Sequence, residues 1–377
     1  MRRAGRERTV RRLLAALLCA ILLLPGTARA ETKTDADVPA QAAYLIEANS
    51  GRVLYAKNEN ARLPMASTTK IMTALLAIES GRMDETVTVP DAAVGTEGSS
   101  MHLKSGETIR LADLVYGLML TSGNDAAVAI ACLLDGGVDA FAKRMNARAA
   151  EMGLVDTHFV NPNGLHDPDH YTTARDLVLL GAAAMENPVF AAVVGTQYRK
   201  TEGSNPHTLK NKNRLLWEYE GGIGVKTGYT KTAGKCLVFA AERGGMKLVG
   251  AILNCPTMWN TAKSMLDLGF STYRVKLFLA ADTLFSVPIE NGEKKTLSAA
   301  PIRGILYPTK ADGSERYTVE TSFGPIRSAP IEAGDTLGTA TLFRDGIAVA
   351  AVPIVAAETV EAVGFGYYFK KAVLAFF

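Results

Sequence analysis

The chain of 377 residues exceeds the length of one usual domain, so we expect two domains and a sizeable hydrophobic core. Its net charge is +3, but the first 30 residues hold seven arginines and one glutamate. Without them 34 basic residues face 37 acidic ones, and this mildly acidic balance argues against a nucleic-acid partner.

Residues 1–30 have the pattern of a secretory signal peptide. A basic stretch ends at Arg12, an apolar run follows over residues 13–24, and Ala28-Arg29-Ala30 supplies the small residues of a cleavage site. The apolar run is much shorter than the about 20 residues that a membrane-spanning helix needs. We therefore predict an exported protein whose mature chain begins at Glu31, with an uncleaved anchor as the alternative.

The predicted elements of the first domain, residues 31–277, run in the order sheet, helices, sheet. They are a β-hairpin (42–46 and 52–55), an amphipathic helix (111–119) that ends just before Ser122, a helix from near Asp125, a second hairpin (236–241 and 247–253) and a closing helix (261–268). Two sequence patterns carry these predictions: apolar residues at helical spacing, and apolar runs around turn residues such as Gly244-Gly245.

The composition changes after about residue 277, where short apolar or alternating runs are separated by turn residues. We predict a small β domain over residues 278–362, with strands at 284–289, 316–321, 336–343 and 347–355. This domain contains no plausible catalytic cluster.

Residues 363–377 form a tail in which aromatic residues recur at helical spacing, with Lys370 and Lys371 beside them. The tail is too short to span a bilayer. As an amphipathic helix it would place its aromatic face at the headgroup boundary and its lysines against anionic lipid, so a membrane surface is a predicted partner. The alternative is a terminal segment packed on the β domain.

No metal site and no cofactor are expected. Cys19 would leave with the signal peptide, and the three remaining cysteines show no C-x-x-C spacing, which argues against a zinc site and a disulfide framework. A bond between Cys236 and Cys255 and a pair of buried free thiols are the two alternatives. The five histidines are scattered, without the ligand spacing of a metal site or the arrangement of a histidine-based triad.

Three short motifs follow one another along the first domain: Ser67-Thr68-Thr69-Lys70, Ser122-Gly123-Asn124 and Lys226-Thr227-Gly228. Each alone has an ordinary structural interpretation, as a helix cap, a turn or a strand end. Their occurrence together and in order favours a catalytic site.

Ser67 and Lys70 are three residues apart, so on a helix their side chains lie one turn apart on the same face. A serine hydroxyl becomes a good nucleophile only when a neighbouring base takes its proton. We predict that the helix N-terminus and a second cation at Lys226 lower the pKa of Lys70, so that the neutral amine is this base.

The motif set resembles the serine penicillin-binding proteins and β-lactamases. The surrounding segments 64–73, 122–126, 161–165 and 225–230 resemble the D-alanyl-D-alanine carboxypeptidases, and the resemblance covers nearly the whole chain. It implies an α/β fold of the β-lactamase/transpeptidase type, with an antiparallel sheet between helices, followed by a small all-β domain.

The resemblance also implies roles for the motif residues. The backbone N–H groups of Ser67 and Tyr229 would bind the oxyanion, and Ser122 would relay a proton to the leaving amine. Asn124 would hold Lys70 and the substrate amide, while Lys226 and Thr227 would bind the terminal carboxylate of the substrate. Gly228 would let the peptide lie against the strand without a side chain in the way.

One stretch departs from the family pattern. Members often carry an arginine before the last helix of the catalytic domain to bind the terminal carboxylate, and residues 254–260 contain none. Either Lys226 and Thr227 carry that role, another basic residue substitutes, or the substrate preference differs.

The predicted function is that of an exported serine D,D-carboxypeptidase of the cell envelope, peripheral on the outer face of the cytoplasmic membrane. It would release the terminal D-alanine from peptidoglycan stem pentapeptides through an acyl-serine intermediate, and β-lactams would inhibit it by acylating Ser67. The alternatives are a D,D-endopeptidase, a β-lactamase or a non-catalytic envelope scaffold. A class A β-lactamase is disfavoured because no E-x-x-L-N segment lies between the second and third motifs.

Overall fold

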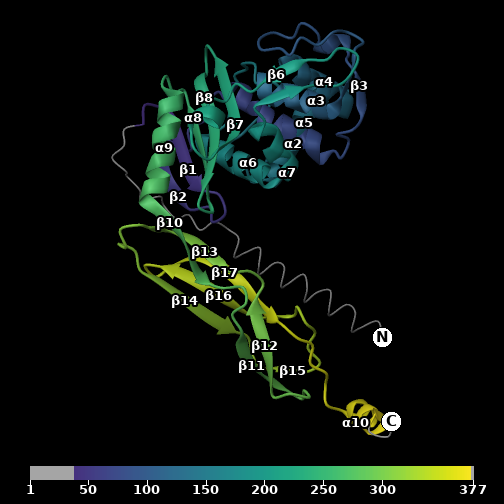
Figure 1. Ribbon diagram of the computed structural model, residues 1–377, viewed down its shortest axis with the longest axis vertical. Coiled ribbons are helices and arrows are strands. Elements are labelled where there is room, and N and C mark those ends of the chain that lie inside the picture. The colour runs from purple at the N-terminus through teal and green to yellow at the C-terminus, as the bar shows by residue number, and fades with distance from the viewer. Residues whose placement is uncertain (1–37, 375–377) are drawn as a thin grey trace. The chain divides into compact units, whose positions relative to one another are not determined.

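The structure, a computed structural model, describes residues 38–374, so the predicted signal peptide and the last three residues of the tail lie outside the described residues. The chain forms two compact units, one ending at Thr272 and the other beginning at Tyr273 (Figure 1). Each unit has its own buried hydrophobic cluster, as expected of separate domains.

The first unit contains a five-stranded antiparallel sheet with the strand order β2-β1-β9-β8-β7. Its strands are β1 (Ala42–Glu47), β2 (Val53–Lys57), β7 (Gly222–Thr230), β8 (Gly234–Arg243) and β9 (Met246–Leu253). The first hairpin joins the later strands through β1 and β9, which pair from Ala42 opposite Leu253 to Glu47 opposite Leu248. Both predicted hairpins are confirmed, and Lys226 lies inside β7, a strand that the predicted elements did not include.

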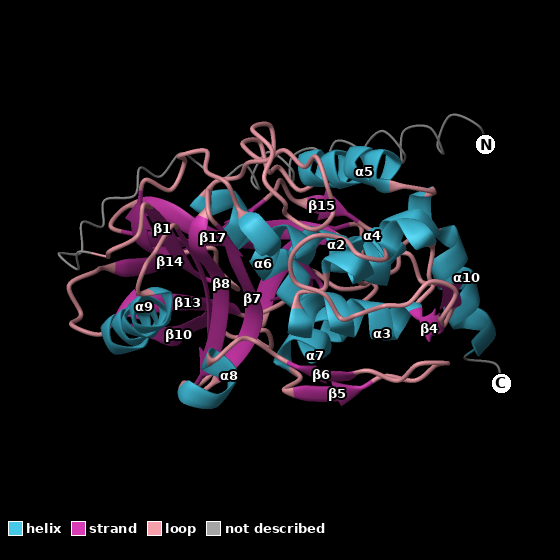
Figure 2. Cartoon of the chain, turned by 90° about the horizontal axis from the view of Figure 1, so that it is seen from above, coloured by secondary structure: helices cyan, strands magenta, loops and turns pink. Residues whose placement is uncertain are grey.

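Helices cover both faces of this sheet (Figures 1 and 2). Gly181 of α6 (Ala174–Glu186) lies against Val249, and Gly269 of α9 (Met258–Thr272) lies against Leu248. Because successive residues of a strand point to opposite faces, these two contacts place α6 and α9 on opposite sides of the sheet. A Cβ on Gly181 would lie 2.9 Å from Val238 Cγ1, so glycine permits this close helix–sheet contact.

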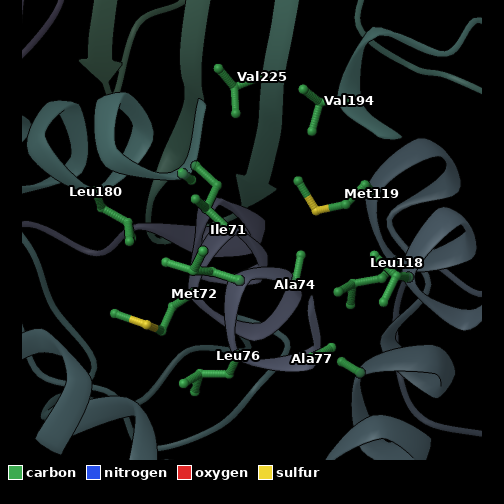
Figure 3. Packing of buried hydrophobic residues seen from close by; sticks show 14 of the residues in the cluster. Ile71, Met72, Ala74, Leu76, Ala77, Leu118, Met119, Leu180, Val194 and Val225 are labelled. Carbon is green, nitrogen blue, oxygen red and sulfur yellow. The ribbon is translucent and has the colours of Figure 1, made fainter. Parts of the chain in front are cut away.

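The region between β2 and β7 is mainly helical. Its further elements are η1 (Ala66–Thr69), α2 (Lys70–Glu79), β3 (Thr86–Thr88), η2 (Asp91–Ala93), β4 (Thr108–Arg110), α3 (Leu111–Tyr116), η3 (Gly117–Thr121), α4 (Asn124–Asp135), α5 (Val138–Glu151), α7 (Pro188–Gly195), β5 (Tyr198–Lys200), β6 (Thr208–Lys210) and α8 (Leu215–Glu218). All residues of α2 except the last are buried. Figure 3 shows Ile71 and Met72 of α2 among side chains of the surrounding elements, including Leu118, Leu180 and Val225. This packing fixes the direction of α2 and so the position of its N-terminus.

The predicted helix over residues 111–119 is present but changes form. After Tyr116 it continues as a wider π-type turn, and Ser122 then ends it in the left-handed region with φ +65°. The wider turn begins at Gly117, where Met101 packs closely against the helix backbone. A Cβ on Gly117 would lie 2.2 Å from Met101 Sδ, so this position needs glycine. The helix predicted near Asp125 is α4, and the closing helix is α9.

The second unit is rich in β structure, which confirms the predicted all-β domain. A six-stranded sheet has the order β14-β16-β17-β12-β11-β15, and β10 pairs with β13 in a second sheet. The strands are β10 (Tyr273–Leu279), β11 (Phe285–Glu290), β12 (Thr296–Pro301), β13 (Ile305–Lys310), β14 (Tyr317–Phe323), β15 (Arg327–Ser328), β16 (Thr336–Arg344) and β17 (Ile347–Ala356). The four predicted strands are confirmed.

Sequence analysis missed β10, β12, β13 and the short β15. β12 and β13 contain proline or several small residues, which weaken a strand pattern. β10 follows α9 without a break, and it starts before residue 277, where the composition changes. The helix α10 (Phe365–Leu374) follows in the tail.

The two alternatives for the cysteines can be compared with the structure. Cys236 and Cys255 are buried free thiols, so the bond between them is not formed. Within residues 38–374 no single helix has the length and apolar composition to cross a membrane, although the pair α6 and α7, bent by 104°, meets those two criteria together.

Shortening a side chain in the core around α2 should cost much of the stability of the first unit. Ile71 is fully buried, so Ile71→Ala should lower the free energy of unfolding by about 2–5 kcal/mol, and Ile71→Val by about 0.5–1.5 kcal/mol. Denaturant unfolding followed by circular dichroism measures both values. As a control, Val155→Ala at an exposed position should change stability by less than about 0.5 kcal/mol. An Ile71→Ala loss no larger than that of the control would contradict the central place of α2.

Candidate active site

The first motif lies at the N-terminus of α2, the most buried helix of the first unit. Ser67 belongs to the 3-10 turn η1 and is partly accessible, while Lys70 opens α2 and is fully buried. Lys70 Nζ lies 3.0 Å from Ser67 Oγ. The predicted one-turn spacing therefore brings an accessible hydroxyl into contact with a buried amine.

Three separate segments of the chain supply acceptors to the Lys70 amine. Besides Ser67 Oγ, Lys70 Nζ donates to Asn124 Oδ1 at 2.6 Å and to the backbone oxygen of Asn163 at 2.5 Å. The second motif is thus joined to the first through Asn124. Sequence analysis marked the segment 161–165 as part of the resemblance but gave Asn163 no role, because its contribution is a backbone carbonyl whose direction no side-chain pattern encodes.

The pKa of Lys70 is lowered well below its ordinary value. The largest cause is burial, which disfavours the charged amine, and the charges of Lys226 and Lys212 act in the same direction. Asp125 opposes this effect. The prediction that Lys226 lowers the pKa of Lys70 is supported, with burial as the larger cause.

Lys226 and Ser122 form a second amine–hydroxyl pair. Lys226 Nζ donates to Ser122 Oγ at 3.0 Å and to the backbone oxygen of Thr227 at 2.9 Å. Burial, with a contribution from the charge of Lys212, lowers the pKa of Lys226 to about 7. Near neutral pH this lysine therefore exists in both the charged and the neutral form.

Asn124 has a fixed amide orientation. Its Oδ1 accepts from Lys70, and its Nδ2 donates to the backbone oxygen of Glu97. Its backbone N–H donates to Ser99 O at 2.7 Å. The side-chain nitrogen Nδ2 carries two hydrogens, and Glu97 O accepts only one of them. The second N–H of Nδ2 therefore remains for a further acceptor.

Two glycines bring backbone segments close to Ser67. A Cβ on Gly164, which has φ +87°, would lie 2.0 Å from Ala66 O, and a Cβ on Gly228 would lie 3.1 Å from Ser67 N. Sequence analysis explained the glycine at position 228 by the space that a bound peptide needs. The structure gives a different explanation for this glycine, since a Cβ there would point at the turn that carries Ser67.

The residues after Lys226 continue along β7. Thr227 is partly accessible beside Lys226, and the side chain of Tyr229 is 65% exposed. The structure therefore brings the predicted residues together in two hydrogen-bonded sets, Lys70 with Ser67 and Asn124, and Lys226 with Ser122. Ser122 and Asn124 belong to one turn, and the charge of Lys226 acts on Lys70, so the two sets are neighbours, with Thr227 and Gly228 beside Lys226.

The segment from residue 158 to 172 supports the start of α2. Thr73 Oγ1 donates to Pro162 O at 2.7 Å. The backbone N–H of Val160 donates to His170 Nδ1 at 3.0 Å, so His170 Nε2 carries the proton and donates to Thr69 Oγ1 at 2.7 Å. Sequence analysis gave His170 no role, since a single histidine without a ligand pattern carries no signal.

Lys212 is a third cation near the site that no motif indicated. Its backbone N–H donates to Leu120 O at 3.0 Å, and its Nζ donates to Ser99 Oγ at 3.2 Å. These contacts place it beside the turn that holds Ser122 and Asn124. Within residues 38–374 no three His, Cys, Asp or Glu side chains are grouped to hold a metal ion.

The arrangement provides the parts for acyl transfer to a serine. It contains an accessible hydroxyl, a buried amine with a lowered pKa in contact with it, and a second amine–hydroxyl pair. Lys212 and the protonated form of Lys226 place positive charge at the site, so the local charge favours an anionic ligand.

Two family models match the sequence. Residues 28–257 match Peptidase S11, the D-alanyl-D-alanine carboxypeptidases, and residues 273–362 match the penicillin-binding protein 5 C-terminal domain. D-alanyl-D-alanine carboxypeptidase DacF of Bacillus subtilis is 34% identical over 96% of this chain and 98% of its own length. DacB2 of Mycobacterium tuberculosis is 39% identical over 62% of this chain and 84% of its own length.

Solved structures agree with these matches. Penicillin-binding protein 5 from Haemophilus influenzae has a TM-score of 0.74 at 27% identity, over 86% of this chain and 98% of the other. The Streptomyces K15 DD-transpeptidase has a TM-score of 0.59 at 35% identity, over 62% of this chain and 97% of the other. The predicted transpeptidase-like fold is therefore confirmed.

The buried His170 should make stability depend on pH. Burial lowers its pKa from 6.5 to about 4 in the folded chain. Between these values the unfolded chain binds a proton here and the folded chain does not, so a fall in pH favours unfolding. The contribution is fully present above pH 6.5 and is lost as the pH falls towards 4, by on the order of 3 kcal/mol.

Denaturant unfolding at several pH values, with the wild-type chain and His170→Gln compared, measures this contribution. The glutamine keeps an N–H donor for Thr69 but does not titrate, so the loss of stability between pH 6.5 and 4 should be smaller in the variant. The same slope of stability against pH in both proteins would show that His170 does not titrate in this way.

Proposed function

The chain belongs to the serine-type D-alanyl-D-alanine carboxypeptidases, Peptidase S11, which act on peptidoglycan, and from that premise we propose how its own residues carry out the reaction. Ser67 attacks the carbonyl between the two terminal D-alanine residues of a stem peptide. The last D-alanine leaves, and water then hydrolyses the acyl-serine.

Lys70 is the base that activates Ser67. The ammonium has three N–H donors and here faces three acceptors, whereas the neutral amine has two N–H donors and one lone pair. In the neutral form the two N–H groups serve the shorter contacts, to Asn124 and Asn163. The lone pair then faces Ser67 Oγ and can take its proton. The lowered pKa of Lys70 supports this state.

The oxyanion is bound by the backbone N–H groups of Ser67 and Tyr229. The close approach of Gly228 to Ser67 N supports this pairing, because it brings β7 against η1 beside the nucleophile. The exposed side chain of Tyr229 is not needed for this role.

Ser122 gives a proton to the leaving amine. Lys226 donates to Ser122 Oγ and can replace that proton, and a pKa of about 7 makes it able to lose one near neutral pH. In its charged form Lys226, with Thr227, binds the terminal carboxylate of the substrate. The second N–H of Asn124 Nδ2 holds the substrate amide.

The contact between Ser67 and a buried, depressed-pKa lysine is the observation that carries this proposal. The same contact argues against a non-catalytic scaffold, because a protein that only binds its partner does not need a buried amine in contact with an accessible hydroxyl. Penicillins, which family members bind, would acylate the same serine.

Replacement of Lys70 should remove most of the acylation. We expect a fluorescent penicillin to label the wild-type chain, Ser67→Ala to take up no label, and Lys70→Ala to react about 100- to 10,000-fold more slowly, the usual contribution of a general base. D-Alanine release from diacetyl-L-Lys-D-Ala-D-Ala should fall in parallel. Lys143→Ala, which removes an exposed lysine of α5, is the matched control.

Acylation of Lys70→Ala at the rate of the control would exclude Lys70 as the base. Labelling of the wild-type chain without D-alanine release would contradict carboxypeptidase action while leaving the acyl-serine in place.

Family members act on the cell wall outside the cytoplasm. For this chain we propose export by residues 1–30 and attachment to the outer face of the cytoplasmic membrane by the tail. In α10 the aromatic side chains of Phe365, Tyr368 and Phe369 are exposed, Phe365 by 86%. They recur at helical spacing, and Lys370 and Lys371 follow in the sequence, which supports an interfacial helix on anionic lipid.

The tail proposal predicts binding to vesicles. The mature chain should co-sediment with vesicles that contain phosphatidylglycerol and less with vesicles of phosphatidylcholine alone, because the lysines add electrostatic attraction. Phe365→Ser together with Phe369→Ser should release it. Val155→Ser, a substitution of an exposed apolar residue outside the tail, is the control. Equal sedimentation of the double variant and the control would assign any binding to another surface.

A further inference from the structure

An irregular segment of the first unit, residues 94–107, lies against the second motif. It runs from η2 to β4 and contains no helix or strand. Two of its carbonyls bind Asn124: Glu97 O accepts from Nδ2, and Ser99 O accepts from the backbone N–H at 2.7 Å. A Cβ on Gly98 would lie 2.8 Å from Asn124 Nδ2, so the segment packs directly on this amide.

The carbonyl of Glu97 decides which way the Asn124 amide points. With Nδ2 towards Glu97 O, Oδ1 faces the Lys70 amine and accepts from it at 2.6 Å. The opposite orientation would set Oδ1 against Glu97 O. It would also offer Lys70 an N–H donor, which would compete with the Ser67 hydroxyl for the lone pair of the neutral amine. The direction of the base therefore depends on a segment that has no regular structure of its own.

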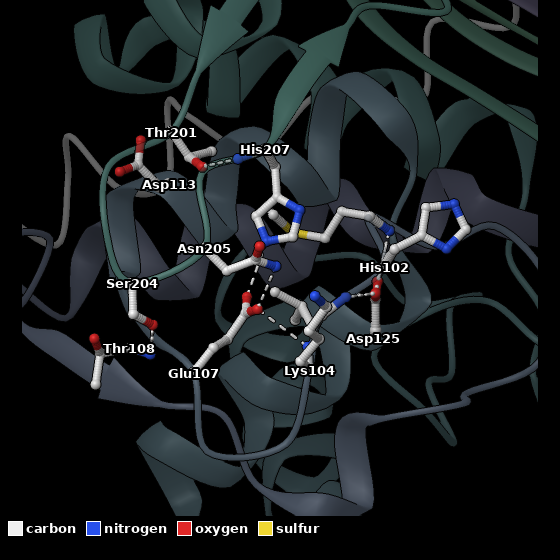
Figure 4. Close-up of polar contacts among 12 residues, drawn as sticks. His102, Lys104, Glu107, Thr108, Asp113, Asp125, Thr201, Ser204, Asn205 and His207 are labelled. Carbon is white, nitrogen blue, oxygen red and sulfur yellow. Dashed lines mark hydrogen bonds and ion pairs between the residues drawn. The ribbon is translucent and has the colours of Figure 1, made fainter.

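Asp125 holds this segment in place. It is 2% exposed, and its carboxylate accepts from the backbone N–H groups of Met101 and Leu103, each at 3.1 Å, and from Ser100 Oγ. Figure 4 shows Asp125 next to His102 of the segment. A buried N–H without an acceptor is costly, so the segment keeps the conformation in which one carboxylate serves both backbone groups.

The carboxylate serves the segment more than its own helix. Asp125 lies in the first turn of α4, where a carboxylate stabilises the helix end. Within α4 it accepts from the backbone N–H of Ala126 at 2.9 Å, whereas the contacts described above go to residues 100–103. A residue that only capped α4 would not make them.

The far end of the segment has a separate anchor. Glu107 lies 2.9 Å from His207 Nε2 and accepts from Asn205 at 2.9 Å, as Figure 4 shows. This anchor joins the end of the segment to the β5–β6 hairpin. Lys212 donates to Ser99 Oγ at 3.2 Å, but this contact is exposed and therefore contributes less. The part of the segment that binds the second motif thus depends on the buried carboxylate.

We propose that Asp125 is a positioning residue for the acylation of Ser67. It holds residues 97–103 so that the carbonyls of that segment fix Asn124, and Asn124 in turn orients the Lys70 amine. The carboxylate acts through these groups and takes no part in the reaction itself. The inference rests on the proposed function, in which Lys70 is the base.

The charge of Asp125 also acts on Lys70. Burial and the charges of Lys226 and Lys212 lower the pKa of Lys70, and the charge of Asp125 raises it. Loss of that charge should lower the pKa of Lys70 further, whereas loosened packing would let water reach the amine and raise its pKa. The acid limb of the acylation rate against pH reports the difference, because the neutral amine is the active form.

Asp125→Asn tests the positioning role. Whichever way the new amide turns, its NH2 group faces at least one backbone N–H that the carboxylate now serves. With a fluorescent penicillin, the second-order rate constant of acylation should fall by about 10- to 100-fold, since a small displacement of a catalytic group can cost this much. The acid limb should move to lower pH.

A double-mutant cycle with Asn124→Ala separates positioning from a general structural loss. If Asp125 acts through Asn124, the double variant should be acylated as slowly as Asn124→Ala alone, because the contact that Asp125 supports is already absent. Two independent effects would instead multiply.

Asp176→Asn is the matched control. Asp176 is 1% exposed, lies in the first turn of α6 and accepts from the backbone N–H of Asp156 at 2.9 Å, so its burial and its contact are of the same kind. This variant should keep the wild-type rate and pH profile. Ser100→Ala removes one donor but keeps the carboxylate, so it should give a smaller loss with an unshifted acid limb. Thermal unfolding of each variant establishes that it is folded.

Three results would overturn the inference. They are an Asp125→Asn rate equal to that of the control, losses that multiply in the cycle, and slower acylation with the acid limb at or above its wild-type pH. If Asp125→Asn does not fold, a wild-type rate in Ser100→Ala would overturn it. A wild-type chain that neither takes up penicillin nor releases D-alanine would overturn the proposed function itself, which is distinguishable from all of these.

Discussion

The burial of one amine, that of Lys70, is the constraint on which the arrangement of the first unit depends. A buried ammonium without partners costs several kcal/mol or more, so its acceptors must be supplied by the fold. They come from positions 67, 124 and 163, which no local structure can bring together. The core around α2 aligns these segments. Burial still disfavours the charged amine, so the pKa of Lys70 is lowered, as a base requires.

Close backbone contact is the second requirement of the site. Gly164 and Gly228 both lie against the turn that carries Ser67, one from the segment after α5 and one from β7. Ala66 in this turn has a positive φ of 48°, a backbone conformation that residues other than glycine adopt only at an energetic cost. The surrounding contacts therefore hold the nucleophile on a constrained turn whose N–H groups have fixed directions, which is the condition for preorganised oxyanion binding.

The same positive charges serve two parts of the reaction. Burial is the main cause that lowers the pKa of Lys70 and Lys226, and the charge of Lys212 adds to it in both cases, which favours a neutral base at Lys70. The charges of Lys212 and of the protonated form of Lys226 attract a carboxylate. Lys212 also offers a physical answer to the missing arginine at residues 254–260, because it places an accessible cation beside Ser122. On the proposed mechanism a bound carboxylate would stabilise the charged form of Lys226, so this one residue would couple substrate binding to proton transfer.

Elements and chemistry that depend on local pattern could be predicted from the residues alone. Apolar periodicity and turn residues predicted the hairpins and the helix before Ser122, and the spacing of Ser67 and Lys70 predicted their contact. What depends on contact between distant segments could not be predicted: the backbone acceptor at Asn163, the neutral His170 beneath Thr69, and the position of Lys212. Strands β12 and β13 were also missed, since their stability comes from neighbouring strands rather than from their own propensity. These features arise from the folded arrangement, because burial and the direction of a carbonyl or an ammonium are set by packing between segments and not by the order of residues within one segment.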